Sequence, residues 1–268
     1  MPRIPRKNKQ TLDKKVKEIV RKQIAEEVEE KHALIDYLTV DLKRAIPSGV
    51  VLNGQGNFFK LLPPIEQSTT GEAGRAYNTR IGNEINLKSV DILGMLSYAN
   101  SNVAQTDYQN GKIAVRIMIL RSKEINDVET LFDNMPTDQL IRFGNTTGTA
   151  NGPAAFTGFG VDVFRTINRD AFSVRYDKII YLDAPTILPG SSQPDVTVVP
   201  SRAKIFKHNM TFGKNGLKLK FTNSGDEFAN NFPYFMVMGY GGQTGIATKP
   251  DDNLAVCNMS VAATYTDA

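Results

Sequence analysis

Apolar side chains recur at every second residue through much of the chain after Asp36, and this period constrains the fold more than any other feature. The clearest run is Ile113, Val115, Ile117 and Ile119. Because successive side chains of a strand point to opposite faces of its sheet, such runs predict strands with one face in a core. We therefore expect an all-β body of about eight strands. The segments that show the pattern are 37–42, 57–65, 85–98, 113–120, 172–182, 205–221, 232–240 and 254–265.

Two local patterns refine this expectation. The apolar alternation changes phase at Lys88-Ser89, which predicts a β-bulge there. Residues 205–221 show two alternating arms with Asn215-Gly216 between them, a pair that suits a tight turn, so they are predicted to form a hairpin.

The connections are predicted from composition. Residues 144–160, 183–200 and 240–253 are rich in Gly, Pro, Asn or Asp and are expected to be long loops, whereas residues 127–143 favour a helix. Loops of this length in a β domain usually form functional surfaces.

Positive charge is concentrated at the start of the chain. The first 23 residues carry nine basic and two acidic side chains, a net charge of +7, whereas the whole chain has a net charge of +4. The rest of the chain is therefore slightly acidic, and a cationic arm is joined to a near-neutral body. The basic residues of the arm are Arg3, Arg6, Lys7, Lys9, Lys14, Lys15, Lys17, Arg21 and Lys22.

The arm also contains a predicted helix. Between Thr11 and about Leu34 there is no Gly or Pro, and apolar residues recur at helical spacing. These apolar residues are Leu12, Val16, Ile19, Val20, Ile24 and Val28. We expect residues 1–31 to form a basic arm with an amphipathic helix and residues 32–268 to form the β domain.

The arm is interpreted as a nucleic-acid-binding segment. Clustered cations bind phosphates without regard to base sequence, and such binding weakens with salt. No aromatic residues are interleaved with the cations, so base stacking is not expected. Lysines at 204, 207, 214, 218 and 220 fit phosphate contact and an ordinary solvated edge equally well.

Residues for catalysis or metal binding are scarce. Only His32, His208 and one cysteine, Cys257, are present, which excludes zinc sites rich in Cys or His, and no nucleophile elbow is found. We therefore expect no enzymatic activity, metal centre or cofactor. Both histidines are interpreted as structural.

Two segments have alternatives. The glycine-rich residues 239–245 lack the Lys-Ser/Thr pair and the following helix of a phosphate loop, so a plain loop is expected. Residues 250–253 contain two acids and an Asn that suit calcium at a subunit contact, although a solvated loop is favoured. No apolar run is long enough to span a membrane, so no membrane partner is expected.

One stretch carries a likeness to a known family. Residues 61–67 read LLPPIEQ, Gly71 follows, and residues 79–85 read TRIGNEI. This resembles the I-x-Q-G…R-x-G-N-x-I segment of the single jelly-roll capsid (coat) proteins of small circular single-stranded DNA (Rep-encoding, circovirus-like) viruses. The chain departs from that pattern by inserting Ser-Thr-Thr directly after Gln67.

The resemblance implies an eight-stranded antiparallel jelly-roll sandwich with a basic N-terminal arm and helix. It further implies a coat protein that self-assembles, commonly as sixty copies, into an icosahedral shell around a single-stranded DNA genome. The arm would face inward, and sixty arms would bring about 420 positive charges to the genome. The implied locations are the virion and, during assembly, the host nucleus or cytoplasm.

Two other classes stay open on the residues alone. One is a cellular β-sandwich binding module with a nucleic-acid-binding tail, which would be a monomer or dimer. The other is a sandwich enzyme acting on carbohydrate. Such an enzyme would need convergent carboxylates in a cleft, and the absence of tryptophan removes a common sugar-binding platform.

Overall fold

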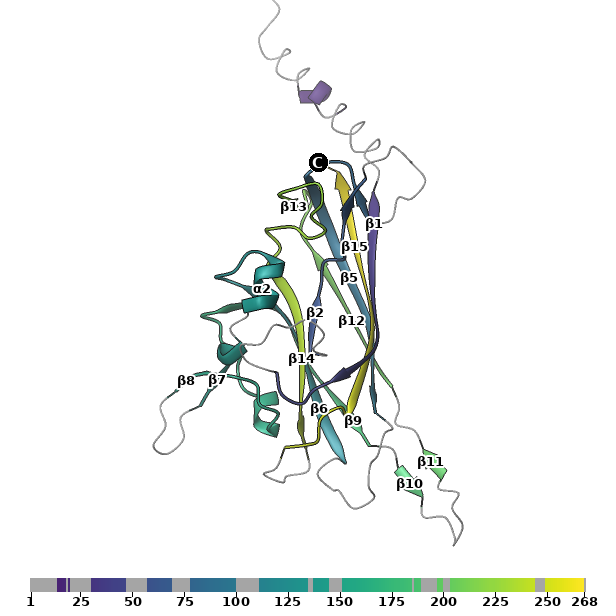
Figure 1. Ribbon diagram of the computed structural model, residues 1–268, viewed down its shortest axis with the longest axis vertical. Coiled ribbons are helices and arrows are strands. Elements are labelled where there is room, and N and C mark those ends of the chain that lie inside the picture. Colours follow the sequence, from purple (N-terminus) through teal and green to yellow (C-terminus); the bar gives the residue numbers. More distant parts are fainter. Residues whose placement is uncertain are drawn as a thin grey trace, which may run out of the picture.

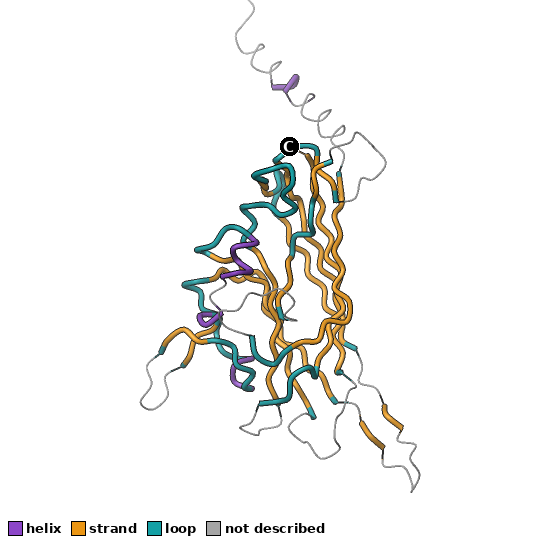
Figure 2. Tube along the Cα trace, in the orientation of Figure 1, coloured by secondary structure: helices purple, strands orange, loops and turns teal. Residues whose placement is uncertain are grey.

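The computed structural model describes residues 14–17, 19, 30–46, 57–68, 78–99, 111–134, 137–144, 151–184, 186–188, 197–199, 203–243 and 249–267. Most of their regular structure is β, and the long strands lie in two sheets that face each other (Figure 1, Figure 2). The expectation of an all-β chain with antiparallel sheets is confirmed.

The first sheet is named the β5 sheet after a central strand. Across it lie, in order, β1 (Lys31–Leu42), β15 (Ala255–Asp267), β5 (Glu84–Tyr98) and β12 (Lys204–Thr211), and β13 (Leu217–Lys220) also pairs with β5. The second, named the β6 sheet, contains β2 (Phe58–Lys60), β14 (Tyr234–Gly242), β6 (Lys112–Ser122) and β9 (Phe172–Asp183), in that order. All these pairs are antiparallel.

Shorter elements fill the connections. β3 (Glu66–Gln67) pairs with β4 (Thr79–Arg80) in parallel. The antiparallel pairs are β7 (Ile141–Phe143) with β8 (Gly152–Ala154), and β10 (Thr186–Leu188) with β11 (Thr197–Val199). The helices are α2 (Val128–Asn134), the 3-10 turns η2 (Thr137–Gln139) and η3 (Gly160–Val163), and a helical stretch at residues 14–17 and 19.

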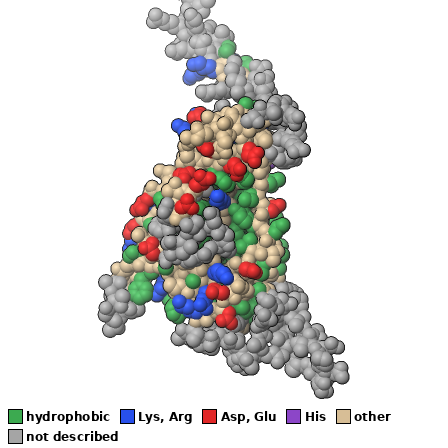
Figure 3. Space-filling view, in the orientation of Figure 1, with side chains coloured by type: hydrophobic (Ala, Val, Ile, Leu, Met, Phe, Trp, Pro, Cys, Tyr) green, Lys and Arg blue, Asp and Glu red, His purple; other side chains and the backbone are tan. Residues whose placement is uncertain are grey.

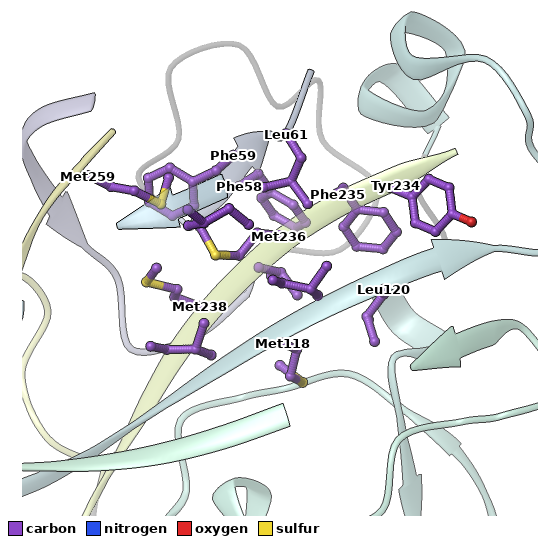
Figure 4. Packing of buried hydrophobic residues seen from close by; sticks show 14 of the residues in the cluster. Phe58, Phe59, Leu61, Met118, Leu120, Tyr234, Phe235, Met236, Met238 and Met259 are labelled. Carbon is purple, nitrogen blue, oxygen red and sulfur yellow. The ribbon is translucent and has the colours of Figure 1, made fainter. Parts of the chain in front are cut away.

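The core lies between the two sheets and is built from the alternating rows that the sequence predicts. Phe59 and Met236 of the β6 sheet face Met259 of the β5 sheet (Figure 4), and the ring of Tyr37 meets that of Phe59 edge-on at 5.1 Å. Burial of such side chains contributes about 1.5–3 kcal/mol each and is the main source of stability.

The outer face of the β6 sheet is also covered. The described residues of the segment 123–171 lie over it (Figure 1), and Phe132 of this segment packs on Phe58 of β2. Strand β6 is consequently buried at every position from Ile113 to Leu120, on both faces. The predicted alternation identifies the side chains of this strand that face the core between the sheets, but the side chains on its opposite face are buried as well.

The predicted bulge is confirmed and the predicted hairpin is wrong. Ser89 pairs with Thr264 and Leu87 with Tyr265, which leaves Lys88 as the extra residue. Strands β12 and β13 do not pair with each other. Both pair with β5: β13 with the residues before Lys88 and β12 with the residues after it. The segment between them loops out and is held by the backbone N–H of Phe212, which donates to the Lys88 carbonyl at 3.0 Å.

Several boundaries also differ from expectation. Strand β1 begins at Lys31, which is predicted to belong to the N-terminal arm and helix but pairs with Tyr265 of β15, and not at residue 37 as predicted. Residues 127–143 are helical only in part, since β7 follows α2 and η2. The expected loops at 144–160 and 183–200 contain β8 and the ribbon of β10 and β11, and that at 240–253 begins after Gly242.

Gly94 provides a test of the core. It lies opposite Phe206, and a Cβ atom on Gly94 would come within 2.5 Å of the ring carbon Cε1. We predict that Gly94→Val lowers the free energy of unfolding by about 2 kcal/mol through overpacking. Gly82→Ala is the matched control, because a Cβ atom on Gly82 would have no atom within 4 Å apart from those of its chain neighbours. Equal urea midpoints for the two variants would contradict this packing.

Candidate nucleic-acid and assembly surfaces

Three of the nine predicted nucleic-acid-binding residues lie in the described part of the arm. Lys14, Lys15 and Lys17 are helical and exposed, and the stretch lies beyond the end of the sandwich at which the C-terminus is found (Figure 1). The other six lie outside the described residues: Arg3, Arg6, Lys7, Lys9, Arg21 and Lys22. Their grouping with the three described lysines stays a prediction.

The lysines of residues 204–220 follow one border of the β5 sheet. Lys204 and Lys207 lie on β12, and Lys218 and Lys220 lie on β13. Lys218 forms an ion pair with Glu84 at 2.6 Å, and both side chains are about half exposed. Charged side chains along such a border discourage pairing with another sheet, which favours the solvated-edge interpretation.

Arg80, from the stretch that carries the family likeness, is fully buried. Its Nη1 donates to the carbonyl of Gly82 at 2.5 Å and to Oδ1 of Asn83 at 3.1 Å. Its Nη2 donates to the carbonyls of Asn223 at 2.8 Å and Asp226 at 3.0 Å. One guanidinium therefore joins two loops that are far apart in the sequence, since Asn223 lies 143 positions after Arg80.

The remaining contacts of Arg80 complete a cluster of residues from the motif. Its guanidinium stacks on the ring of Phe221 at 4.1 Å, and Nη1 also approaches Oε1 of Gln67 at 3.4 Å. Gln67 in turn donates to the carbonyl of Ile81 at 2.9 Å. Burial lowers the pKa of Arg80, while the nearby carboxylates of Asp226 and Asp267 oppose that shift. The sequence motif thus folds into a structural tie.

The same end of the sandwich is fastened to the chain's last strand. The hydroxyl of Tyr265 donates to the Thr79 carbonyl at 2.6 Å, and the backbone N–H of Ile81 donates to Oδ1 of Asp267 at 3.1 Å. Asp267 also pairs with Lys31 at 2.6 Å. Since Lys31 begins β1, these contacts fix the point at which the arm leaves the body.

A second buried arginine fastens the cover of the β6 sheet. Arg116 is 4% exposed and makes a two-pronged ion pair with Asp177, at 2.8 and 2.7 Å. Its Nη1 donates to the carbonyls of Asp162 and Arg165, at 3.2 and 2.5 Å. The Asp162 carboxylate is itself buried and accepts from the backbone and hydroxyl of Thr157, both at 2.8 Å. Residues 157–165, which we call the η3 segment, are therefore held onto strand β6 by Arg116.

The glycine-rich segment has a packing role that the sequence interpretation missed. Gly241 and Gly242 belong to β14, so the expected plain loop is wrong for them, whereas Gly239 lies in β14 as the predicted strand 232–240 has it. A Cβ on Gly239 would lie 2.7 Å from the Phe156 ring, and one on Gly241 would lie 2.7 Å from the Phe159 carbonyl oxygen. Glycine lets the η3 segment approach the strand closely.

His208 lies where the edges of the two sheets approach each other. Its ring packs against that of Tyr176 of β9 at 4.5 Å. A cavity of about 210 Å³ beside it is lined in part by Arg175, which donates to the hydroxyl of Tyr234 at 2.9 Å. Burial lowers the pKa of His208. The other histidine, His32, approaches Thr264 at 3.2 Å on the exposed side of β1.

The acidic segment considered for calcium is tied to its neighbours. Oδ1 of Asp252 accepts from the backbone N–H of Arg44 at 3.0 Å, and the Arg44 side chain donates to the Pro250 carbonyl at 2.8 Å. The hydroxyl of Tyr240 donates to the Asp251 carbonyl at 2.6 Å. These contacts give Asp252 a structural role in closing the connection between β14 and β15.

The described residues contain no group of three or more His, Cys, Asp or Glu side chains placed to hold a metal ion. No helix found among them is both long enough and apolar enough to cross a membrane. No protein-family model matches the chain, and no curated protein matches it.

The Arg80 cluster leads to a prediction about stability. Replacing Arg80 by methionine would leave buried carbonyls without donors, so we expect the free energy of unfolding to fall by about 3 kcal/mol. Arg80→Lys should recover only part of the loss, because an ammonium lacks the planar fork of donors. Lys218→Met removes an exposed cation of the neighbouring strand and should cost under about 1 kcal/mol. Chemical denaturation measures all three, and similar losses for Arg80→Met and Lys218→Met would contradict the tie.

His208 leads to a prediction about pH. Its pKa in the folded protein lies below the ordinary value of 6.5, so the unfolded chain binds more protons and stability falls as the pH drops through about 6.5. We expect the melting temperature of the wild type to fall more than that of His208→Gln between about pH 7.5 and pH 5.5. Acidic residues are common to both proteins, so parallel curves would refute the contribution of His208.

Proposed function

We propose that this chain is a structural viral capsid protein that self-assembles into an icosahedral shell and packages nucleic acid through its basic N-terminal arm. The fold we assign to it is an eight-stranded jelly roll, and the genome implied by the family likeness is single-stranded DNA. The observation that carries the proposal is the nested pairing of strands in the two sheets.

The nested pairing follows from the order along the chain of the strands in the two sheets, with β13 taken as the continuation of β12 beside β5. The first pairs with the last (β1 with β15), the second with the last but one (β2 with β14), then β5 with β12 and β6 with β9. This is the pairing of one long antiparallel ribbon whose successive pairs alternate between the two sheets. A jelly roll is a sandwich of this kind, and shell proteins of viruses commonly use it.

Exposed apolar side chains on the η3 segment support assembly. Phe159, Val161 and Phe164 are 41%, 53% and 56% exposed, although the segment beneath them is clamped by Arg116. A rigid segment that presents three large apolar side chains to solvent is typical of a surface that is covered by another protein. In the proposed shell, this surface contributes to contacts between subunits.

The distribution of charge supports the role of the arm. On the face of the body shown in Figure 3, acidic and basic side chains both occur, so the body presents no uniform positive surface there. The lysines described in the arm are exposed. Nucleic acid in the proposed particle is therefore held mainly by the arm, through phosphate contacts that weaken as salt is raised.

The proposal predicts large particles that contain nucleic acid. The full-length recombinant protein is expected to elute near the void volume in size exclusion, to show closed shells in negative-stain microscopy and to copurify with host nucleic acid. A discrete monomer or dimer at every salt concentration would instead favour the alternative, a cellular β-sandwich binding module with a nucleic-acid-binding tail.

The role of the arm is tested separately. Deletion of residues 1–22 should abolish copurification of nucleic acid, measured by the ultraviolet absorbance ratio, and leave the body folded. The matched control replaces five lysines of the body with glutamine, at 204, 207, 214, 218 and 220, and should retain most of the nucleic acid. Unchanged copurification after the deletion would refute this role.

A further inference from the structure

The borders of the two sheets approach each other where β9 meets β12, and a cavity of about 210 Å³ opens beside that contact. The contact itself is the packing of the Tyr176 ring on the His208 ring. The cavity is lined by Arg175 of β9 on one side and by residues 208–212 of β12 and its end on the other. One water molecule needs only about 10–15 Å³, so the space is large enough for a polyatomic ion.

A β-bulge brings Arg175 to this cavity. In the pairing of β6 with β9, Ile119 lies opposite Tyr176 and Leu120 lies opposite Val174, which leaves Arg175 as the extra residue. Bulges redirect side chains and are frequent beside functional sites. Here two successive residues of β9 reach the same region, because Tyr176 meets His208 and Arg175 lines the adjoining cavity.

The guanidinium of Arg175 is held in place and keeps donors for a ligand. Its Nη2 donates to the hydroxyl of Tyr234 at 2.9 Å, and its Cζ lies 5.3 Å from the centre of the same ring. A guanidinium has five N–H donors, so this hydrogen bond uses one of them. Arg175 is exposed as a whole, and a ligand from solvent can therefore reach it.

The β12 side of the cavity supplies donors of its own. The imidazole of His208 carries at least one N–H. Strand β12 is a border strand, and every second backbone N–H of such a strand points away from its partner. The N–H of Phe212 donates to Lys88 of β5, so the N–H of Thr211, one residue earlier, points toward the open side. Side-chain and backbone donors thus face Arg175 across the cavity.

The charge of the cavity suits an anion. Arg175 contributes a positive charge, and among the described residues no carboxylate lines the space. Asp91 of β5 lies opposite Asn209 and accepts a hydrogen bond from its side chain. Since Asn209 and His208 are successive residues of a strand, this contact lies on the face of the sheet away from His208. Burial lowers the pKa of His208, and an anion beside the ring would favour its charged form.

We propose that this cavity binds a phosphate group, either as the free ion or as part of a small ester such as a nucleotide. Arg175 and His208 contact the phosphate oxygens, because a fork of charged donors matches the geometry of an oxyanion. Met210 and Phe212 give the cavity an apolar side for the organic part of an ester. The site lies in the body rather than in the arm, and its binding of phosphate does not depend on shell formation.

Thermal unfolding of the full-length chain tests the site. At pH 7.5, millimolar phosphate should raise the melting temperature of the wild type by a few degrees more than sodium chloride of equal ionic strength, because a ligand of the folded state stabilises it. Arg175→Gln and His208→Gln should each raise the half-saturating phosphate concentration at least severalfold. Arg121→Gln is the matched control and should respond like the wild type. Its guanidinium lies 6.0 Å from the same Tyr234 ring, but it does not line the cavity as described.

The outcomes separate this site from general attraction of anions. A response that is lost in both cavity variants and kept in Arg121→Gln supports the proposal. An equal response in all four proteins would overturn it, because the arm and other surface cations would then account for the effect. Absence of any response in the wild type would overturn it too. The shift caused by phosphate is compared rather than the melting temperature itself, so a general loss of stability does not imitate a loss of binding.

Two further probes identify the source of the phosphate group. If thymidine 5′-monophosphate half-saturates the wild type at a severalfold lower concentration than inorganic phosphate, the site takes an ester; equal concentrations indicate the free ion. Thymidine, which lacks the phosphate, should cause no shift. A shift with thymidine as large as that with its monophosphate would overturn recognition through phosphate.

Sulfate tests the part of His208, because sulfate keeps its double charge throughout the range used. Between about pH 7.5 and pH 5.5, the half-saturating sulfate concentration of the wild type should fall severalfold, since anion and proton favour each other at the ring. His208→Gln should remove this dependence. The groups that face the ring from β9, Arg175 and Tyr176, are present in both proteins, as is His32. The same pH dependence in both proteins would refute the contact with His208.

Discussion

The sandwich depends on keeping one row of apolar side chains from each strand in the space between the two sheets. Strand β5 is 15 residues long and pairs with β12, β13 and β15. A slip of one residue would turn its buried row toward solvent. The bulge at Lys88 prevents this, because it allows both Leu87 and Val90 to be fully buried despite the change of phase between them. The break between β12 and β13 at the same level shows that one extra residue affects both neighbours of β5.

Hydrophobic burial does not satisfy the backbone of irregular segments, and two arginines do so here. Arg80 donates to carbonyls of the loop that follows β13, and Arg116 donates to carbonyls of the η3 segment. Each joins a segment without regular pairing to a strand or to its end. A guanidinium suits this task because it offers five donors in one plane and stays charged when it is buried.

The sequence predicted the features that depend on local alternation and missed those that depend on distant partners. The core row of β6 and the bulge at Lys88 follow from neighbouring residues alone. Asn215-Gly216 suits a hairpin turn, but it also suits a loop after which the strand resumes beside the same neighbour, and local composition does not distinguish the two. Likewise, Gly241 and Gly242 belong to β14, and the reason for a glycine at 241 is the close approach of Phe159, which lies far away in the sequence.

The candidate functional surfaces were likewise predictable only where they depend on local sequence. The concentration of charge in the arm is visible in composition, and the motif around Arg80 is recognisable as a pattern. Its physical role becomes clear only when the carbonyls of Asn223 and Asp226 are brought to the guanidinium. The exposed Leu93 and Met95 were missed because they occupy the solvent row of β5, where isolated apolar residues are common. They form a cluster only once Ile205 is aligned beside them.

The unequal covering of the two sheets gives the body two different sides. The β6 sheet is covered by a segment of its own chain that presents apolar side chains farther out, at η3, whereas the β5 sheet exposes its apolar residues directly. The contacts of Asp267 with Lys31 and Ile81 hold Lys31, the first residue of β1, at the border of the β5 sheet. In the proposed shell, this polarity would let one side meet the packaged polymer while the other surfaces meet neighbouring subunits.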